Sequence, residues 1–438
     1  MISIGKAMHQ QLVCAVFLMF SAILLENVGV ATPPSTFNLV APSNRTASAS
    51  VTPTFSWGAS SSGVTYTLEI ATAQTFGAAD VVKQQGIASL SYMVAAPLNP
   101  GVVFFWQVTA VNSGGSVVAA NGPFEFSAPV TVGSGQPGSL VVTPDGTRVL
   151  VASGDSSSGV LADVSLASHA VTLSIPVGVT PTGVAIRSDG QEAVVANGIG
   201  HSITVVDLTN DTVKTTIQVP CVGTTLYDIA YTPDGTKAVF PDLSSGCTLD
   251  GIRTITLASQ AQNFVQISAQ GGGIAVMHNG DSALVTGGIL GTFVDRMNLS
   301  THAVTSVTGT SSTFGIAVTP NSRQAVTASG FGDTVKRIDL LTDAVVGATP
   351  YASNYSTHNV AITPDGYRAV VVGGSDTALI SLIDDTVLTL YPDGGDSVAI
   401  SPDGKFAYVS IYVSGNIVKL HVIRIPPANE IFLDSFEE

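Results

Sequence analysis

The stretch Pro181–Val219, PTGVAIRSDGQEAVVANGIGHSITVVDLTNDTVKTTIQV, contains the unit from which most of the chain is built. It holds four short runs of apolar and β-branched residues, separated by Gly, Asp or Asn. Such runs are typical of short strands that are joined by tight turns. The stretch therefore predicts four antiparallel strands, at residues 183–186, 192–197, 202–207 and 212–219.

The first turn of this unit, Ser188-Asp189-Gly190, has counterparts throughout residues 137–425. Its central Asp or Asn returns at intervals of 38 to 45 residues. A steady period of this length is the signature of an array in which every repeat forms one structural unit. Seven repeats of this strand-and-turn unit predict a seven-bladed β-propeller. The other copies are Pro144-Asp145-Gly146, Pro233-Asp234-Gly235, His278-Asn279-Gly280, Pro320-Asn321-Ser322, Pro364-Asp365-Gly366 and Pro402-Asp403-Gly404.

The quoted unit resembles the YVTN family of β-propeller repeats. Tyr408-Val409-Ser410 comes nearest to the tetrapeptide that names the family, and Val194–Asn197 and Val370–Gly373 occupy the same place in other repeats. The resemblance covers all seven repeats, and repeats four and five depart from it most. It implies that residues 128–426 form a seven-bladed propeller.

The two ends of the array suggest how it closes. The last repeat contains only three strands before Pro426-Pro427 ends it. The segment Pro129–Gly133, which precedes the first repeat, matches Ile175–Gly178 at the end of that repeat. We therefore predict that this segment supplies the missing fourth strand of the last sheet and leaves no open edge.

Residues 35–127 form a separate unit before the array. Large apolar residues alternate with small or polar ones in its strands, as in a half-buried sandwich. The unit resembles the fibronectin type III family through Trp57, Tyr66 and Leu98–Gly101, but it has Phe104 where that family usually places a tyrosine. The resemblance implies a spacer or adhesion module. The predicted strands are Thr54–Trp57, Tyr66–Ala71, Phe104–Val111 and Phe124–Phe126.

The N-terminus has the pattern of a secretory signal peptide at residues 1–31. Lys6 precedes an apolar run, Leu12–Leu25, which is short for a membrane span, and Gly29-Val30-Ala31 fits a cleavage site. We expect a secreted, periplasmic or cell-surface protein that keeps no transmembrane segment after cleavage. Residues 427–438 are predicted to be an acidic tail.

The composition bears on the possible partners. The 438-residue chain has a formal net charge of -15, and only 11% of its residues are charged. Nucleic-acid binding needs clustered Lys and Arg, which the sequence lacks, so a nucleic-acid partner is not expected. Many of the acidic residues lie in the repeated turns, where they shape the turn and favour solubility.

Two cysteines, Cys221 and Cys247, would remain after cleavage. One pair in an exported protein favours a disulfide. In a propeller, the loops that enter the first strands share one face with the loops that join the second and third strands. Both cysteines would lie on this face, and we predict that they form a disulfide.

The same face carries the candidate site. Six of the seven residues just before the first strands are small or neutral, and Asp228 is the exception. A metal centre would need several His or carboxylate ligands there, so we expect no metal and no cofactor. One position earlier stand four larger side chains, which with Asp228 and Asn359 suit a small polar ligand or a peptide. The alternative is that they only pack the channel. The seven are Ser139, Gly183, Asp228, Gly273, Gly315, Asn359 and Ser397, and the four are Tyr227, Phe314, His358 and Asp396.

Catalytic motifs are missing from the sequence: it has no GxSxG elbow, HExxH pair, EF-hand loop or P-loop. We expect a non-catalytic exported protein whose propeller face engages a protein, a glycan or a small ligand at the cell envelope. The alternative is a lactonase-like hydrolase or lyase, because similar propellers include such enzymes, with Asp228, His358 and Asp396 as candidate groups. A third interpretation is a structural component of a surface layer or matrix.

Overall fold

The structure is a computed structural model, and every regular element in the part that it describes is a β-strand. No helix within that part is long and apolar enough to span a membrane. Three predicted features lie outside the described residues: residues 1–30 of the signal peptide, residues 428–438 of the tail, and both cysteines of the disulfide. The structure describes residues 31–427 except 49, 78–79, 221–223, 245–249, 269–270, 288–292, 311–312, 330–333, 352–356 and 414–415.

The strands before residue 128 form two sheets that meet through aromatic side chains. Trp57 and Tyr66 lie in different sheets with ring centroids 5.5 Å apart. Phe104 is buried and stacks on Phe126 with ring centroids 5.5 Å apart, as expected of a ring that contributes by packing alone. One sheet contains β1 (Leu39–Ala41), β3 (Thr54–Trp57) and β6 (Ser91–Met93); the other contains β2 (Thr46–Ala47), β9 (Phe124–Ser127), β7 (Val103–Asn112), β4 (Thr65–Ala71), β5 (Asp80–Ile87) and β8 (Gly115–Val118).

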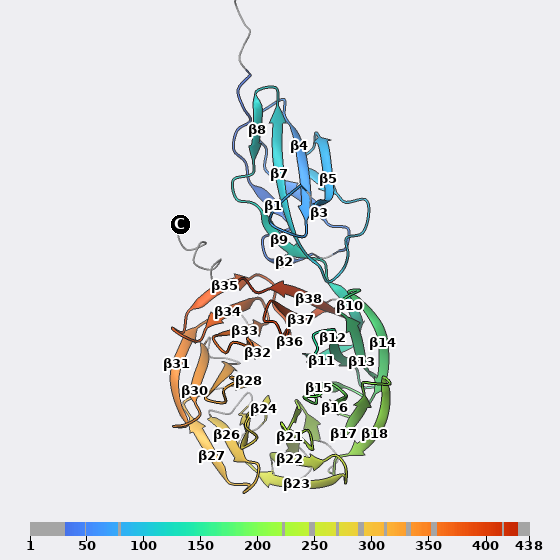
Figure 1. Cartoon of the computed structure of the whole chain (residues 1–438), viewed down its shortest axis with the longest axis vertical. Helices are drawn as coiled ribbons and strands as arrows, with labels where there is room; N and C mark the ends of the chain where they lie inside the picture. Colours follow the sequence, from blue (N-terminus) through green and yellow to red (C-terminus); the bar gives the residue numbers. More distant parts are fainter. Residues whose placement is uncertain are drawn as a thin grey trace, which may run out of the picture. The chain divides into compact units, whose positions relative to one another are not determined.

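From Val130 onward the described strands form seven antiparallel sheets around a common centre (Figure 1). The four strands predicted in the quoted stretch are β15 to β18. The sheets are β11 (Gln136–Val142), β12 (Arg148–Gly154), β13 (Gly159–Ser165), β14 (Ala170–Val177); β15 (Pro181–Ile186), β16 (Glu192–Asn197), β17 (Ser202–Asp207), β18 (Thr212–Gln218); β19 (Thr224–Leu226), β20 (Ala230–Tyr231), β21 (Lys237–Ser244), β22 (Gly251–Thr256), β23 (Ala261–Gln266); β24 (Ile274–Val276), β25 (Ser282–Thr286), β26 (Phe293–Asn298), β27 (Val304–Thr308); β28 (Thr313–Val318), β29 (Gln324–Ser329), β30 (Thr334–Asp339), β31 (Ala344–Pro350); β32 (Thr357–Ile362), β33 (Arg368–Gly373), β34 (Thr377–Ser381), β35 (Val387–Tyr391); and β36 (Ser397–Ile400), β37 (Phe406–Val413), β38 (Ile417–Arg424), β10 (Val130–Ser134).

The inner strands contact one another in an unbroken circuit, in which each strand touches the next and the last touches the first: β11, β15, β20, β24, β28, β32 and β36. The predicted closing strand is β10, which pairs antiparallel with β38 from Val130 opposite Leu420 to Ser134 opposite Ile417. Val132 is buried with Val130 in the apolar cluster between the first and last sheets. The prediction that a segment before the first repeat completes the last sheet is therefore confirmed.

The repeated turns are held by their Asp or Asn side chains. Asp145 Oδ1 accepts a hydrogen bond from the Thr147 backbone N–H at 3.0 Å, and Gly146 adopts a φ of 68°. Asn321 makes the same bond, from Arg323 N–H, at 3.0 Å. An amide oxygen thus replaces the carboxylate in this role, which explains why the turn survives in the most divergent repeats.

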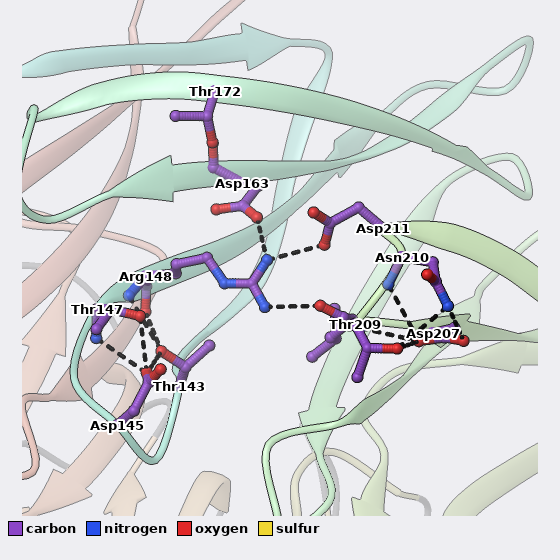
Figure 2. Close-up of polar contacts among 11 residues, drawn as sticks. Thr143, Asp145, Thr147, Arg148, Asp163, Thr172, Asp207, Thr209, Asn210 and Asp211 are labelled. Carbon is purple, nitrogen blue, oxygen red and sulfur yellow. Dashed lines mark hydrogen bonds and ion pairs between the residues drawn. The ribbon is translucent and has the colours of Figure 1, made fainter.

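Arginine side chains join neighbouring sheets. Figure 2 shows Arg148, on β12, between two carboxylates: its Nη1 lies 2.7 Å from Asp163 on the same sheet and 2.8 Å from Asp211 of the next sheet. Its Nη2 donates to the Leu208 carbonyl of that next sheet at 3.1 Å. The guanidinium therefore fixes the β17–β18 turn to the preceding sheet.

Similar bridges recur around the array. Arg296 contacts Asp343 at 2.8 Å, and Arg337 binds both oxygens of Asp385, at 2.9 and 2.7 Å. Each aspartate lies in a turn between the third and fourth strands with a positive φ, 52° at Asp211, 50° at Asp343 and 57° at Asp385. Asp tolerates this left-handed conformation better than most residues because its short side chain bonds locally.

Replacement of Arg337 by Met is expected to lower the free energy of unfolding by about 2 kcal/mol, because it leaves the partly buried Asp385 without its bidentate partner. Urea denaturation of the full chain measures the loss. Lys405→Met is the control, since Lys405 pairs with Asp403 in an exposed position and should matter by less than about 0.5 kcal/mol. Equal losses in the two variants would show that the arginine bridge does not stabilise the array.

Candidate functional site

A pocket of about 240 Å³ lies where the inner strands begin, and every one of the seven sheets contributes to it. All six residues proposed from the sequence line this pocket: Tyr227, Asp228, Phe314, His358, Asn359 and Asp396. Residues that the sequence reasoning did not single out also line it, namely Pro137, Gly138, Thr182 and Gly272. These stand within two positions of the predicted ring, so the same spacing from the repeated turn could have found them.

Several pocket residues lie where the pairing of the inner strands is irregular. The register of β28 with β29 shifts around Phe314 and Gly315, and that of β32 with β33 shifts around His358. In the third sheet the inner strand is split into β19 and β20, and Tyr227 and Asp228 lie in the break. Irregular pairing of this kind re-aims side chains and is frequent next to functional sites.

The glycines of the predicted ring are explained by close packing of neighbouring inner strands. A Cβ on Gly183 would lie 2.8 Å from the Asp228 Cα, and one on Gly315 would lie 2.7 Å from the Asn359 Cα. Adjacent sheets therefore approach to backbone contact at these points. Gly315 lines the pocket, whereas Gly183 of the predicted ring does not, so close packing of the sheets is the role that both glycines share.

At three of the four non-glycine positions of the same ring, a side-chain oxygen accepts a backbone N–H from the following sheet. The bonds are Ser139 Oγ from Val184 N–H at 2.6 Å, Asp228 Oδ2 from Ile274 N–H at 3.2 Å and Ser397 Oγ from Leu140 N–H at 3.4 Å. These polar side chains therefore help to hold neighbouring sheets together at the pocket.

Asp228 is the most perturbed acid of the pocket. Its Oδ1 also accepts the N–H of Ile229 at 2.9 Å, so the carboxyl is held by two backbone groups. Burial disfavours the ionised form and raises the pKa of Asp228 to about 6, although both hydrogen bonds act in the opposite direction. Near neutral pH this group is thus able to exchange a proton or to carry a charge.

His358 and Asp396 face each other at the pocket. The His358 Nδ1 lies 3.9 Å from Asp396 Oδ1 and 3.1 Å from the Gly395 carbonyl, and both side chains are 37% exposed. Burial raises the pKa of Asp396, while the nearby His358 and the hydrogen bond from Tyr412 N–H lower it. The contact with a carbonyl oxygen indicates that Nδ1 carries the proton of the imidazole.

Of the remaining candidates, Asn359 is hydrogen-bonded within the protein, whereas Tyr227 and Phe314 are accessible at the pocket. Asn359 accepts the Val360 N–H at 2.7 Å and donates to Ser397 Oγ at 3.3 Å, so its amide is engaged by the protein. Tyr227 is 47% exposed and Phe314 is half-buried, so both rings are accessible at the pocket. Across the described residues, no group of three or more His, Cys, Asp or Glu side chains could hold a metal ion.

An all-β chain of repeated four-stranded sheets, of the β-propeller kind, is the class that these observations define. In comparisons with solved structures, the chain is similar to Kuenenia stuttgartiensis hydrazine synthase, a propeller-containing protein, with a TM-score of 0.56 and 20% identity. The likeness covers 67% of this chain and 97% of that chain, and at this identity it shows the fold alone. No family model matches the chain, and no curated protein does either.

Proposed function

We propose that the chain is an exported, non-catalytic binding protein in which a fibronectin type III-like sandwich precedes a seven-bladed β-propeller of the YVTN kind. The seven sheets and the unbroken circuit of their inner strands support the propeller. The predicted signal peptide supports a location outside the cytoplasm, secreted, periplasmic or at the cell surface.

The observation that carries the binding function is the convergence of six residues, foreseen from repeat position alone, on one pocket. Converging polar groups beside accessible aromatic rings are typical of ligand sites. At about 240 Å³ the pocket is smaller than sites for drug-sized molecules, which occupy roughly 300–1,000 Å³. Its occupant is therefore a small molecule, or one projecting group of a glycan or protein.

A hydrolase or lyase of the lactonase kind is the second candidate function. The observation in its favour is the pKa of Asp228, about 6, because a group that titrates near neutral pH suits general acid–base chemistry. Against it stands the engagement of Asp228 by two backbone N–H groups, which gives the residue a structural reason to be present.

A paired screen separates the two functions. The full chain is tested for turnover of lactones and related esters, and by native mass spectrometry for retention of compounds from a library of sugars, amines, acids and esters. The proposal predicts no turnover and at least one retained compound, which Tyr227→Ala and Phe314→Ala variants no longer hold. Turnover that falls in both Asp228→Asn and His358→Ala would overturn it in favour of the enzyme. A library from which nothing is retained would also count against it.

A further inference from the structure

The pocket has a consistent electrostatic character. Two carboxyl groups line it, from Asp228 and Asp396, and none of its described lining residues is Lys or Arg. His358 is the one imidazole among them, and its Nδ1 already faces a carbonyl and a carboxylate. An anionic ligand would meet two carboxylates without a cation to balance them, so the lining disfavours anions.

The rings of the pocket favour the opposite charge. Tyr227 is the residue before Asp228, and Phe314 comes from a different sheet of the same lining. An ammonium group near an aromatic face is attracted by the ring quadrupole. Its charge-assisted hydrogen bonds to carboxylates are roughly twice as strong as neutral ones. The carboxylates and the aromatic rings of the pocket therefore both favour an ammonium group.

The size of the pocket limits the ligand further. A space of about 240 Å³ admits an alkyl chain of a few carbons with its head group, and not a large cation. The acids are also fixed in place: Asp228 by Ile229 and Ile274 N–H groups, and Asp396 by the Tyr412 N–H at 3.2 Å. A fixed acceptor loses little conformational freedom on binding.

We infer that this pocket takes a primary ammonium group on a short alkyl chain, supplied by a free amine or by a lysyl side chain. The inference rests on the proposed binding function and names its ligand class. It assigns Asp228 and Asp396, from different sheets of the lining, as the negative charges that favour the ammonium group, and Tyr227 and Phe314 to the alkyl chain and the cation.

Isothermal titration of the full chain at pH 8 and low salt tests the inference with three matched probes: hexylammonium, hexanol and hexanoate. We expect hexylammonium to bind at least about tenfold more tightly than either of the others. Asp228→Asn and Asp396→Asn are each expected to weaken it by about tenfold. Two variants are used because Asp228 also bonds a neighbouring sheet, and Asp396→Asn keeps the test valid if Asp228→Asn does not fold.

Asp403→Asn is the matched control. It removes the same charge from a repeated turn, at the position where two other repeats carry Asn279 and Asn321, so its fold should be kept and its hexylammonium affinity unchanged. A blocked peptide with one lysine, compared with its norleucine counterpart, distinguishes the source. Tighter binding of the lysine peptide than of hexylammonium indicates a protein ligand, and equal or weaker binding indicates a free amine.

Binding of hexanol or hexanoate as tight as that of hexylammonium would overturn the inference and leave the binding function standing. Hexylammonium affinity that both aspartate variants keep would also overturn it, because the cation would then lie elsewhere. Absence of hexylammonium binding overturns it as well. The proposed function fails separately, through the library screen or the appearance of turnover.

Discussion

Deletion of residues 128–134 is expected to lower the Tm of the array by about 10 °C. The deletion removes β10, whose Val130 and Val132 are buried beside Val418 and Leu420 of β38. Burial of each valine contributes about 1.5–3 kcal/mol, so the loss is on the order of 5 kcal/mol before the exposed edge of β38 is considered. For a unit of this size, 1 kcal/mol corresponds to roughly 2 °C.

Point variants separate closure from the general effects of a deletion. Val132 is buried whereas Thr131, its neighbour on β10, is exposed. Val132→Asp buries an unpaired carboxylate and should cost several kcal/mol, on the order of 3 or more, whereas Thr131→Asp should change stability by less than about 0.5 kcal/mol. Calorimetry of both variants, with the deletion, measures the contrast. A deletion that leaves the Tm unchanged, or equal losses from both substitutions, would contradict the closing role of β10.

Lowering the pH from 7 to 4 is expected to remove about 3 kcal/mol of stability through His421. This side chain, on β38, is 2% exposed, and its Nδ1 has no hydrogen-bond partner among the described residues. Burial lowers the pKa of His421 to about 4, from an ordinary value near 6.5. The unfolded chain therefore takes up the proton first. The contribution is complete above pH 6.5 and is lost as the pH falls from 6.5 to about 4.

Three partly buried acids change the stability in the opposite direction when the pH falls. Burial raises the pKa values of Asp228, Asp396 and Asp393, the last with an oxygen 4.0 Å from the His421 Nδ1. Acids of this kind gain stability as the pH falls, so the wild-type curve alone is not diagnostic. The comparison with His421→Leu, by urea unfolding at pH 4 to 7, isolates the histidine.

We expect the difference in stability between wild type and His421→Leu to change by about 3 kcal/mol over this pH range, in favour of the variant at low pH. His278→Ser, at an exposed turn, is the control for the removal of a histidine. A His421→Leu difference that stays constant from pH 4 to 7 would show that the buried imidazole titrates normally.

The strands and the pocket positions were predictable because they depend on local chemistry. A turn centred on Asp or Asn follows every inner strand, and a fixed spacing from it predicted Tyr227, Phe314 and His358 as pocket residues. The closing strand was recognisable because Pro129–Gly133 repeats a pattern found at the end of the first repeat. Each of these signals is contained within one repeat or in the match between two.

Features that depend on which sheets become neighbours could not be predicted in the same way. The bridge from Arg148 to Asp211 joins residues in different repeats, and the sequence does not show that the turn of one faces the arginine of the other. The hydrogen bonds that Asp228 and Ser139 accept from the next sheet also join residues of different repeats. The sequence therefore indicated which residues meet at the pocket, but not that several of them also join the sheets.

Amide hydrogen exchange of the full chain, followed at residues 130–134 and 417–424, tests the closure of the ring most directly. The pocket depends on this closure because the Leu140 N–H of the first sheet bonds Ser397 Oγ of the last. If β10 closes the ring, both segments are protected and lose protection together, at the rate of global unfolding. Full exchange of residues 130–134 within seconds, while the other sheets stay protected, would contradict this closure.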